Sequence, residues 1–79
     1  MTGRRVPRPS TRAAPGLRYL RTSRALTQAE LAARAGVRRS TIARLEGGQE
    51  ARMPTLRRLA RALGVEPSEL MRPPPEQRP

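Results

Sequence analysis

Apolar residues recur at helical spacing from residue 17 onward. Leu17, Leu20 and Arg21 share one face at i, i+3 and i+4, which predicts a first helix of roughly two turns. Thr27 is a favourable N-cap residue, and Glu30, three residues later, completes a capping box. A second helix is therefore expected to begin at the residue after Thr27.

Between residues 28 and 46 the spacing is that of two short helices crossing at a tight turn. The inward positions of this pair are taken by Leu31, Ala35, Ile42 and Leu45. Gly36 lies at the corner, where a residue that ends a helix often adopts positive φ, a conformation that favours glycine. A third helix is expected over residues 39–46, ended by two glycines and followed by an extended, flexible link. This pattern is typical of the helix-turn-helix motif of DNA-binding proteins.

Two more helices are predicted after the link. Thr55 is expected to cap a fourth helix that ends at Gly64, and Pro67 fits the first position of a short fifth helix. The residues expected to face the core from these helices are Leu56, Leu59, Ala60, Leu63, Leu70 and Met71. Five short helices around one core predict an all-α fold over residues 16–72.

The two ends of the chain differ from its centre. Residues 1–15 hold four Arg, three Pro and no acidic residue. With almost nothing apolar to bury, they are predicted to form a disordered basic arm whose removal leaves the melting temperature unchanged. Residues 73–79 open with three prolines and are predicted to form a stiff, disordered tail. The sequence leaves open whether the arm contacts DNA or is inert leader.

The charge balance indicates the kind of partner. The 79-residue chain has 17 basic and six acidic residues, a formal net charge of +11, and every basic residue is Arg. Such a balance favours a polyanionic partner. A GC-rich genome also explains the preference for Arg over Lys, so only the placement of the arginines can argue for function.

Composition also argues against several function classes. The chain lacks Cys, His and Asp, and its glutamates have helix-cap or ion-pair explanations, so we expect no enzyme activity, no metal site and no cofactor. The sequence contains no apolar run of membrane-spanning length and no apolar secretion signal. A soluble cytoplasmic protein without membrane contact is therefore expected.

The order of these residues resembles the Cro/phage-repressor (XRE) family of helix-turn-helix domains. The resemblance rests on LxxLR at 17–21, LTQxxLA at 26–32, GV at 36–37, STIxxLExG at 40–48 and LAxALGV at 59–65. It implies a five-helix, lambda-repressor-like DNA-binding domain, flanked here by the arm and the tail.

The resemblance also implies roles for individual residues. In the family the third helix lies in the major groove, so Arg39, Ser40 and Arg44 take the base-reading positions. The positions that contact the DNA backbone are occupied by Gln28, Arg38, Thr41, Gly47, Gly48 and Arg52. Arg21 and Glu46 correspond to a structural ion pair between the first helix and the end of the third. The alternative for each exposed arginine is a solvated charge without a role in binding.

Two positions depart from the family pattern. Arg38 stands where many relatives have a capping Ser, Thr or Asp, so the third helix is expected to be poorly capped and to start half a turn later. Glu50 lies in the link, where a negative charge is unfavourable close to phosphate.

The sequence is therefore interpreted as a transcription regulator, a repressor, that binds double-stranded DNA as a homodimer on an inverted repeat. Two alternatives stay open. The first is an antitoxin-type module that binds a partner protein as well as DNA, and the second is an adaptor or RNA-associated protein of the same fold. A neighbouring toxin gene would favour the first, and equal affinity for RNA and DNA the second.

Overall fold

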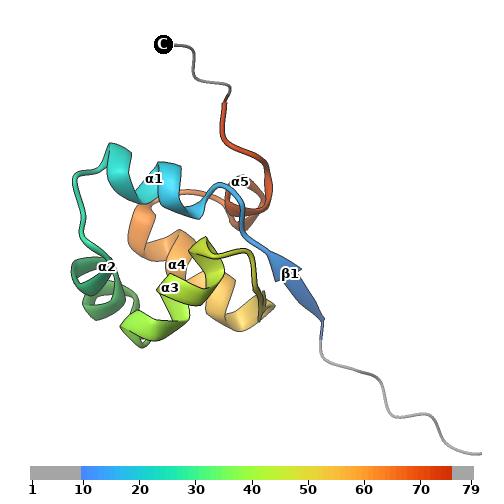
Figure 1. Ribbon diagram of the computed structural model, residues 1–79, viewed down its shortest axis with the longest axis horizontal. Coiled ribbons are helices and arrows are strands. Elements are labelled where there is room, and N and C mark those ends of the chain that lie inside the picture. The colour runs from blue at the N-terminus through green and yellow to red at the C-terminus, as the bar shows by residue number, and fades with distance from the viewer. Residues whose placement is uncertain (1–9, 76–79) are drawn as a thin grey trace, which may run out of the picture.

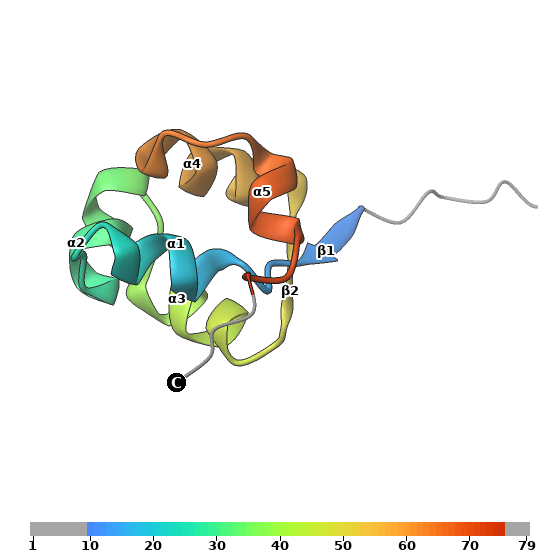
Figure 2. The ribbon, with the colours of Figure 1, turned by 90° about the horizontal axis from the view of Figure 1, so that it is seen from above.

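The computed structural model describes residues 10–75. In chain order the elements are β1 (Thr11–Ala13), α1 (Leu17–Ser23), α2 (Gln28–Ala35), α3 (Arg39–Glu46), β2 (Glu50–Arg52), α4 (Met53–Leu63) and α5 (Pro67–Met71). The helices pack around one core, and β1 extends from one side of the bundle (Figure 1). From above, α4 and α5 lie on one side of this bundle and α1 and α3 on the other (Figure 2).

The start and end of α2 follow from local chemistry. The Thr27 hydroxyl accepts a hydrogen bond from the Glu30 amide at 3.0 Å, and the Glu30 carboxylate accepts one from the Thr27 amide at 2.8 Å. These reciprocal bonds confirm the predicted capping box. Gly36 ends the helix with φ of 70°, so the corner of the motif has the positive φ expected of it.

The core consists of aliphatic side chains from all five helices. Its largest fully buried members are Leu17, Leu31, Ile42, Leu56, Leu59 and Leu70. All of these except Leu17 were predicted to face the core, whereas Met71, also predicted, is half-buried at the edge. A core without aromatic rings depends on close contact among small and branched side chains, so loss of any large member leaves a cavity.

The all-α prediction was incomplete, because the described residues include a two-stranded antiparallel sheet. Thr11 pairs with Arg52, Arg12 with Ala51 and Ala13 with Glu50. The link after the third helix is therefore a strand. Each strand has only three residues, too few for an alternating apolar pattern to reveal it.

The boundary predicted at residue 16 was also wrong. The residues after Pro9 belong to the fold: β1 pairs with β2, and Ala14 is 2% exposed within the core. The rest of the predicted arm, residues 1–9, and residues 76–79 of the predicted tail lie outside the described residues. Residues 73–75 follow α5 without regular secondary structure.

The start of α4 differs from prediction, whereas α3 spans the predicted residues 39–46. Thr55 does not cap α4, which begins at Met53 with Arg52 in the N-cap position. The cause is Pro54, whose fixed φ fits the first helical turn and lets the helix begin before Thr55. Helix α3 begins at Arg39, not half a turn later, although its N-cap residue makes no side-chain capping bond, as expected from an arginine there.

Removing residues 1–15 is expected to lower the free energy of unfolding by about 1–2 kcal/mol. The truncation removes β1, the buried methyl group of Ala14 and the bond from the Leu17 amide to the Ala14 carbonyl, which is 3.1 Å long. Thermal unfolding measures the effect. Arg12→Ala is the control, because its exposed side chain leaves the strand pairing intact. A truncated protein with the melting temperature of the full chain would contradict a structural role for β1.

Candidate nucleic-acid interface

Helix α3 has one buried and one exposed face. Ile42 is 0% and Leu45 is 3% exposed, so these two residues fix the rotation of the helix against the core. The side chains predicted to read bases, those of Arg39, Ser40 and Arg44, are exposed. The helix therefore presents two guanidinium groups and a hydroxyl group to solvent.

Arg44 is held by the loop after its own helix. Its Nε donates a hydrogen bond to Gln49 Oε1 at 3.2 Å. Next to this contact is a shallow hollow of about 260 Å³ lined by Thr11, Thr41, Arg44, Leu45, Gln49, Glu50, Ala51, Arg52 and Thr55. The structure thus brings three predicted site residues, Thr41, Arg44 and Arg52, to one place.

The same hollow contains polar residues that the sequence did not single out. The Thr11 hydroxyl donates a hydrogen bond to Glu50 Oε1 at 2.6 Å across the two strands. This bond gives the acidic side chain of Glu50 a partner within the sheet. Thr11 and Gln49 were missed because their places depend on the strand pairing and on the exact path of the chain after the two glycines, and the sequence specified neither.

Two glycines turn the chain from α3 into β2. The Gly47 amide donates to the Ala43 carbonyl at 3.0 Å, and Gly48 has φ of 102°, in the left-handed region that favours glycine. The Gln49 amide then donates back to the Arg44 carbonyl at 3.0 Å. This tight turn keeps the backbone of both predicted contact glycines next to the end of α3.

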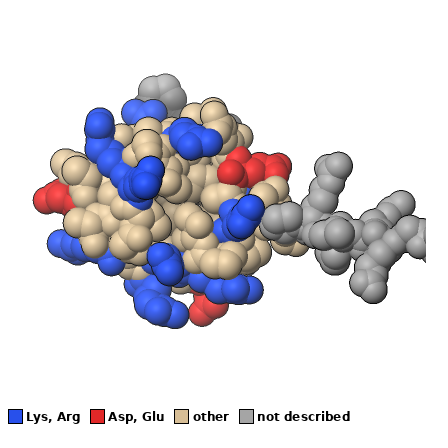
Figure 3. Space-filling view, turned by 90° about the horizontal axis from the view of Figure 1, so that it is seen from below, with Lys and Arg blue, Asp and Glu red and all other residues tan. Residues whose placement is uncertain are grey.

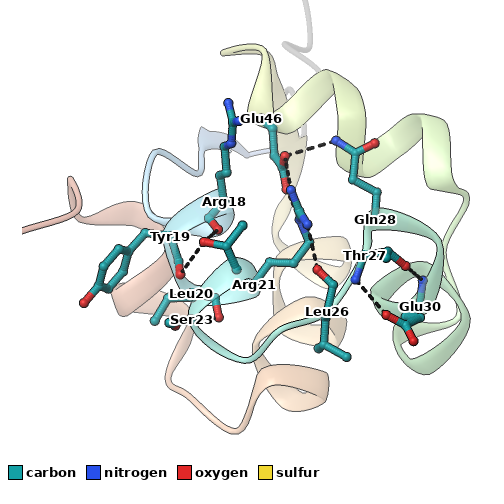
Figure 4. Close-up of polar contacts among 11 residues, drawn as sticks. Arg18, Tyr19, Leu20, Arg21, Ser23, Leu26, Thr27, Gln28, Glu30 and Glu46 are labelled. Carbon is teal, nitrogen blue, oxygen red and sulfur yellow. Dashed lines mark hydrogen bonds and ion pairs between the residues drawn. The ribbon is translucent and has the colours of Figure 1, made fainter.

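A polar junction ties α1 to the end of α3. Arg21 Nε donates to Glu46 Oε2 at 2.6 Å, and Arg21 Nη2 donates to Glu46 Oε1 at 3.0 Å (Figure 4). Arg21 Nη1 also donates to the Leu26 carbonyl at 2.7 Å. The two side chains are only 11% and 7% exposed. The ion pair thus connects α1, the α1–α2 loop and α3.

Gln28, predicted to contact the DNA backbone, belongs to the same junction. Its side chain is half-buried at the start of α2, and its Nε2 donates to Glu46 Oε1 at 3.0 Å. Figure 4 shows Gln28 and Arg21 reaching the Glu46 carboxylate from different elements. The resemblance predicted the ion pair and the DNA-backbone contact of Gln28 separately, but did not indicate that the Glu46 carboxylate bonds to both Arg21 and Gln28.

The environment of Glu46 favours its charged form. Burial by itself raises the pKa of Glu46, but the hydrogen bonds from Arg21 and Gln28, together with the charges of Arg21 and Arg18, outweigh burial and hold this pKa below its ordinary value of 4.5. The hydrogen bond to Glu46 raises the pKa of Arg21. The pair is therefore fully ionised at neutral pH.

The lowered pKa of Glu46 predicts a loss of stability in acid. Because the folded protein binds this proton more weakly than the unfolded chain, the stabilisation is complete above about pH 4.5 and disappears as the pH falls through the lowered pKa. The difference in melting temperature between the wild type and Glu46→Gln is expected to shrink from pH 7 to about pH 3. Glu30, whose pKa is also lowered, is present in both proteins, so its titration does not affect the difference between their melting temperatures. A difference in melting temperature that did not change with pH would contradict the lowered pKa of Glu46.

Further arginines lie on the surface outside this site, and Figure 3 shows more basic than acidic side chains on the face that it displays. Arg24 has a structural role, because its Nε donates to the Leu63 carbonyl at 2.9 Å and so caps the end of α4. Exposed arginines on α4 are Arg57, Arg58 and Arg61. The described residues contain no group of three or more His, Cys, Asp or Glu side chains that could hold a metal ion.

Comparisons with known proteins point to the same fold. A family model described as helix-turn-helix matches residues 17–70. A solved structure, that of the restriction-modification controller protein C.AhdI from Aeromonas hydrophila, is similar with a TM-score of 0.64 and 40% sequence identity, covering 68% of this chain and 83% of that one. No curated protein sequence matches the chain. Among the described residues, none of the helices is long and apolar enough to cross a membrane.

Proposed function

Because the chain belongs to the XRE-type helix-turn-helix family of DNA-binding transcription regulators, we propose that it recognises a specific DNA sequence by placing α3 in the major groove. The observation that carries the proposal is the outward face of α3, where Arg39, Ser40 and Arg44 are exposed opposite the buried Ile42 and Leu45. Each arginine is suited to a pair of hydrogen bonds with O6 and N7 of a guanine.

The residues around α3 are proposed to bind phosphates and thereby set the register of the helix. They are Gln28 at the start of α2, Arg38 before α3, Thr41 and Arg52 at the hollow, and the backbone of Gly47 and Gly48. Contacts of this kind orient a protein on DNA without distinguishing base pairs. Variants at these positions are therefore expected to weaken binding to every sequence alike.

We further propose that the protein acts as a repressor and binds an inverted repeat as a homodimer. A protein bound at a promoter blocks access to it, and the exposed residues of α3 are those proposed to bind there. A dimer would place two copies of α3 about 34–36 Å apart, one turn of the double helix. Native mass spectrometry of the complex checks the proposal: two chains per duplex support it, and one chain contradicts it.

Arg44→Ala is the direct test of base reading. After selection of a preferred site from a random DNA library, we expect the variant to lose about 1–3 kcal/mol of affinity for that site and to relax preference at one base pair. The fold should persist because the side chain is exposed. Arg61→Ala is the control, since it removes an equal charge from α4 and should leave the ratio of specific to random affinity unchanged.

Two outcomes would contradict the proposal. Equal weakening of Arg44→Ala on the selected site and on random DNA would place Arg44 on phosphate instead of a base. Equal affinity of the wild type for RNA and DNA, with no sequence preference, would instead favour the adaptor or RNA-associated alternative. The similarity to a protein described as a restriction-modification controller supports transcriptional regulation.

A further inference from the structure

The orientation of the Gln28 amide group is determined by Glu46. A side-chain amide has a donating nitrogen and an accepting oxygen, whereas an ionised carboxylate can only accept hydrogen bonds. With Glu46 charged, the nitrogen of Gln28 must face it, and the observed contact joins Gln28 Nε2 to Glu46 Oε1 at 3.0 Å. The carboxylate therefore fixes which end of the amide faces inward.

The carboxylate is itself immobilised. Arg21 donates to both of its oxygens, at 2.6 and 3.0 Å, and a third bond from Arg21 to the Leu26 carbonyl holds the guanidinium group in place. At 7% exposure, the Glu46 side chain has little room to rotate. The Glu46 carboxylate is therefore a rigid hydrogen-bond acceptor next to the Gln28 side chain.

We propose that Glu46 is a positioning residue for DNA binding: it takes one amide hydrogen of Gln28 and so presents the other to a phosphate oxygen. The inference rests on the proposed function, in which Gln28 contacts the DNA backbone. It adds to that function a role for the ion pair that joins α1 to α3, because this pair also helps to orient the side chain that contacts DNA. Arg21 acts one step further away by holding the carboxylate.

This role predicts a result opposite to that of simple electrostatics. A carboxylate near DNA repels phosphates, so neutralising Glu46 would by charge alone raise the affinity for any duplex. If Glu46 instead positions Gln28, neutralisation lets the amide rotate and lowers the affinity. The sign of the change therefore separates the two effects.

The test is a double-mutant cycle on binding to a random-sequence duplex, measured well below the melting temperature of each variant. Gln28→Ala should weaken binding roughly fivefold, the equivalent of about 1 kcal/mol, which is the typical net contribution of one hydrogen bond. Glu46→Gln should weaken it roughly two- to fivefold in the wild type. In the Gln28→Ala protein the same change should leave affinity unchanged or raise it, because no amide is left to position.

Two results of this cycle would overturn the positioning role of Glu46. A gain in affinity for Glu46→Gln in the wild type, or an equal loss in both backgrounds, overturns the positioning role, since a merely structural effect would not depend on Gln28. Failure of the proposed function is visible separately, as failure of the wild type to bind any duplex or to select a sequence.

A second measurement needs no variant at Glu46. In the nuclear magnetic resonance spectrum of the free wild type, one side-chain amide hydrogen of Gln28 should show the downfield shift and slow exchange of a bond to carboxylate. Adding the random-sequence duplex should then shift mainly the other hydrogen. Two hydrogens with the shifts of a freely solvated amide would overturn the proposal even if Glu46→Gln failed to fold.

Discussion

Gly16→Ala is expected to lower the melting temperature by roughly 5–20 °C, the equivalent of about 1–3 kcal/mol for overpacking in a domain of this size. A Cβ atom on Gly16 would lie 2.7 Å from the Glu69 carbonyl oxygen and 2.8 Å from that of Arg72. Both neighbours are backbone atoms, which cannot move without shifting α5. The Gly16 amide also donates to the Leu70 carbonyl at 2.9 Å, so any shift weakens this bond as well.

Gly47→Ala provides the control. Gly47 has φ of −84°, a conformation open to alanine, and its added Cβ would lie 3.4 Å from the Ala43 oxygen and 3.5 Å from that of Arg44. These are ordinary contacts, so the free energy of unfolding should change by no more than about 0.5 kcal/mol. Equal melting temperatures for the two variants would mean that the backbone approach at Gly16 is looser than described.

Glu46→Ala is expected to lower the free energy of unfolding by about 3–5 kcal/mol. The substitution removes the counter-charge of Arg21, whose side chain is only 11% exposed. One of the three hydrogen bonds of Arg21, to the Leu26 carbonyl, remains. At a few degrees per kcal/mol, the variant should be largely unfolded at temperatures where the wild type is intact. Thermal and denaturant unfolding measure the loss.

Glu50→Ala is the matched control for Glu46→Ala. It also removes a carboxylate, but Glu50 is exposed and accepts a single hydrogen bond, from the Thr11 hydroxyl. The expected loss is below about 1 kcal/mol. Equal losses of stability in Glu46→Ala and Glu50→Ala would show that the ion pair contributes no more to stability than a surface contact.

The features that could be predicted from the sequence are those set by neighbouring residues. The capping box of Thr27 and Glu30, the positive φ of Gly36 and the buried stripe of α4 each depend on residues a few positions apart. The start of α4 was misplaced because two local signals competed: Pro54 favours an early first turn, whereas Thr55 is the better cap by residue type.

The features that escaped prediction join distant segments. The register of Thr11 with Arg52 is decided by how the folded helices place two three-residue segments, neither of which has a strand pattern of its own. The contact of Gln28 with Glu46 requires α2 and α3 to be packed already. Gly16 escaped prediction for the same reason: the atoms that exclude a side chain there belong to α5 and the residue after it.

The bond from the Gly16 amide to the Leu70 carbonyl has a consequence for how the protein is made. It joins the start of the first helix to the last helix, so a chain emerging from the ribosome can form α2 and α3 early but cannot complete the packing of α1 until α5 has emerged. Until then the bundle lacks the contacts of α5 with α1 and α4, and Leu70, fully buried in the finished fold, is not yet in place. Incomplete chains thus keep apolar surface exposed, where chaperones and proteases can distinguish them from finished copies.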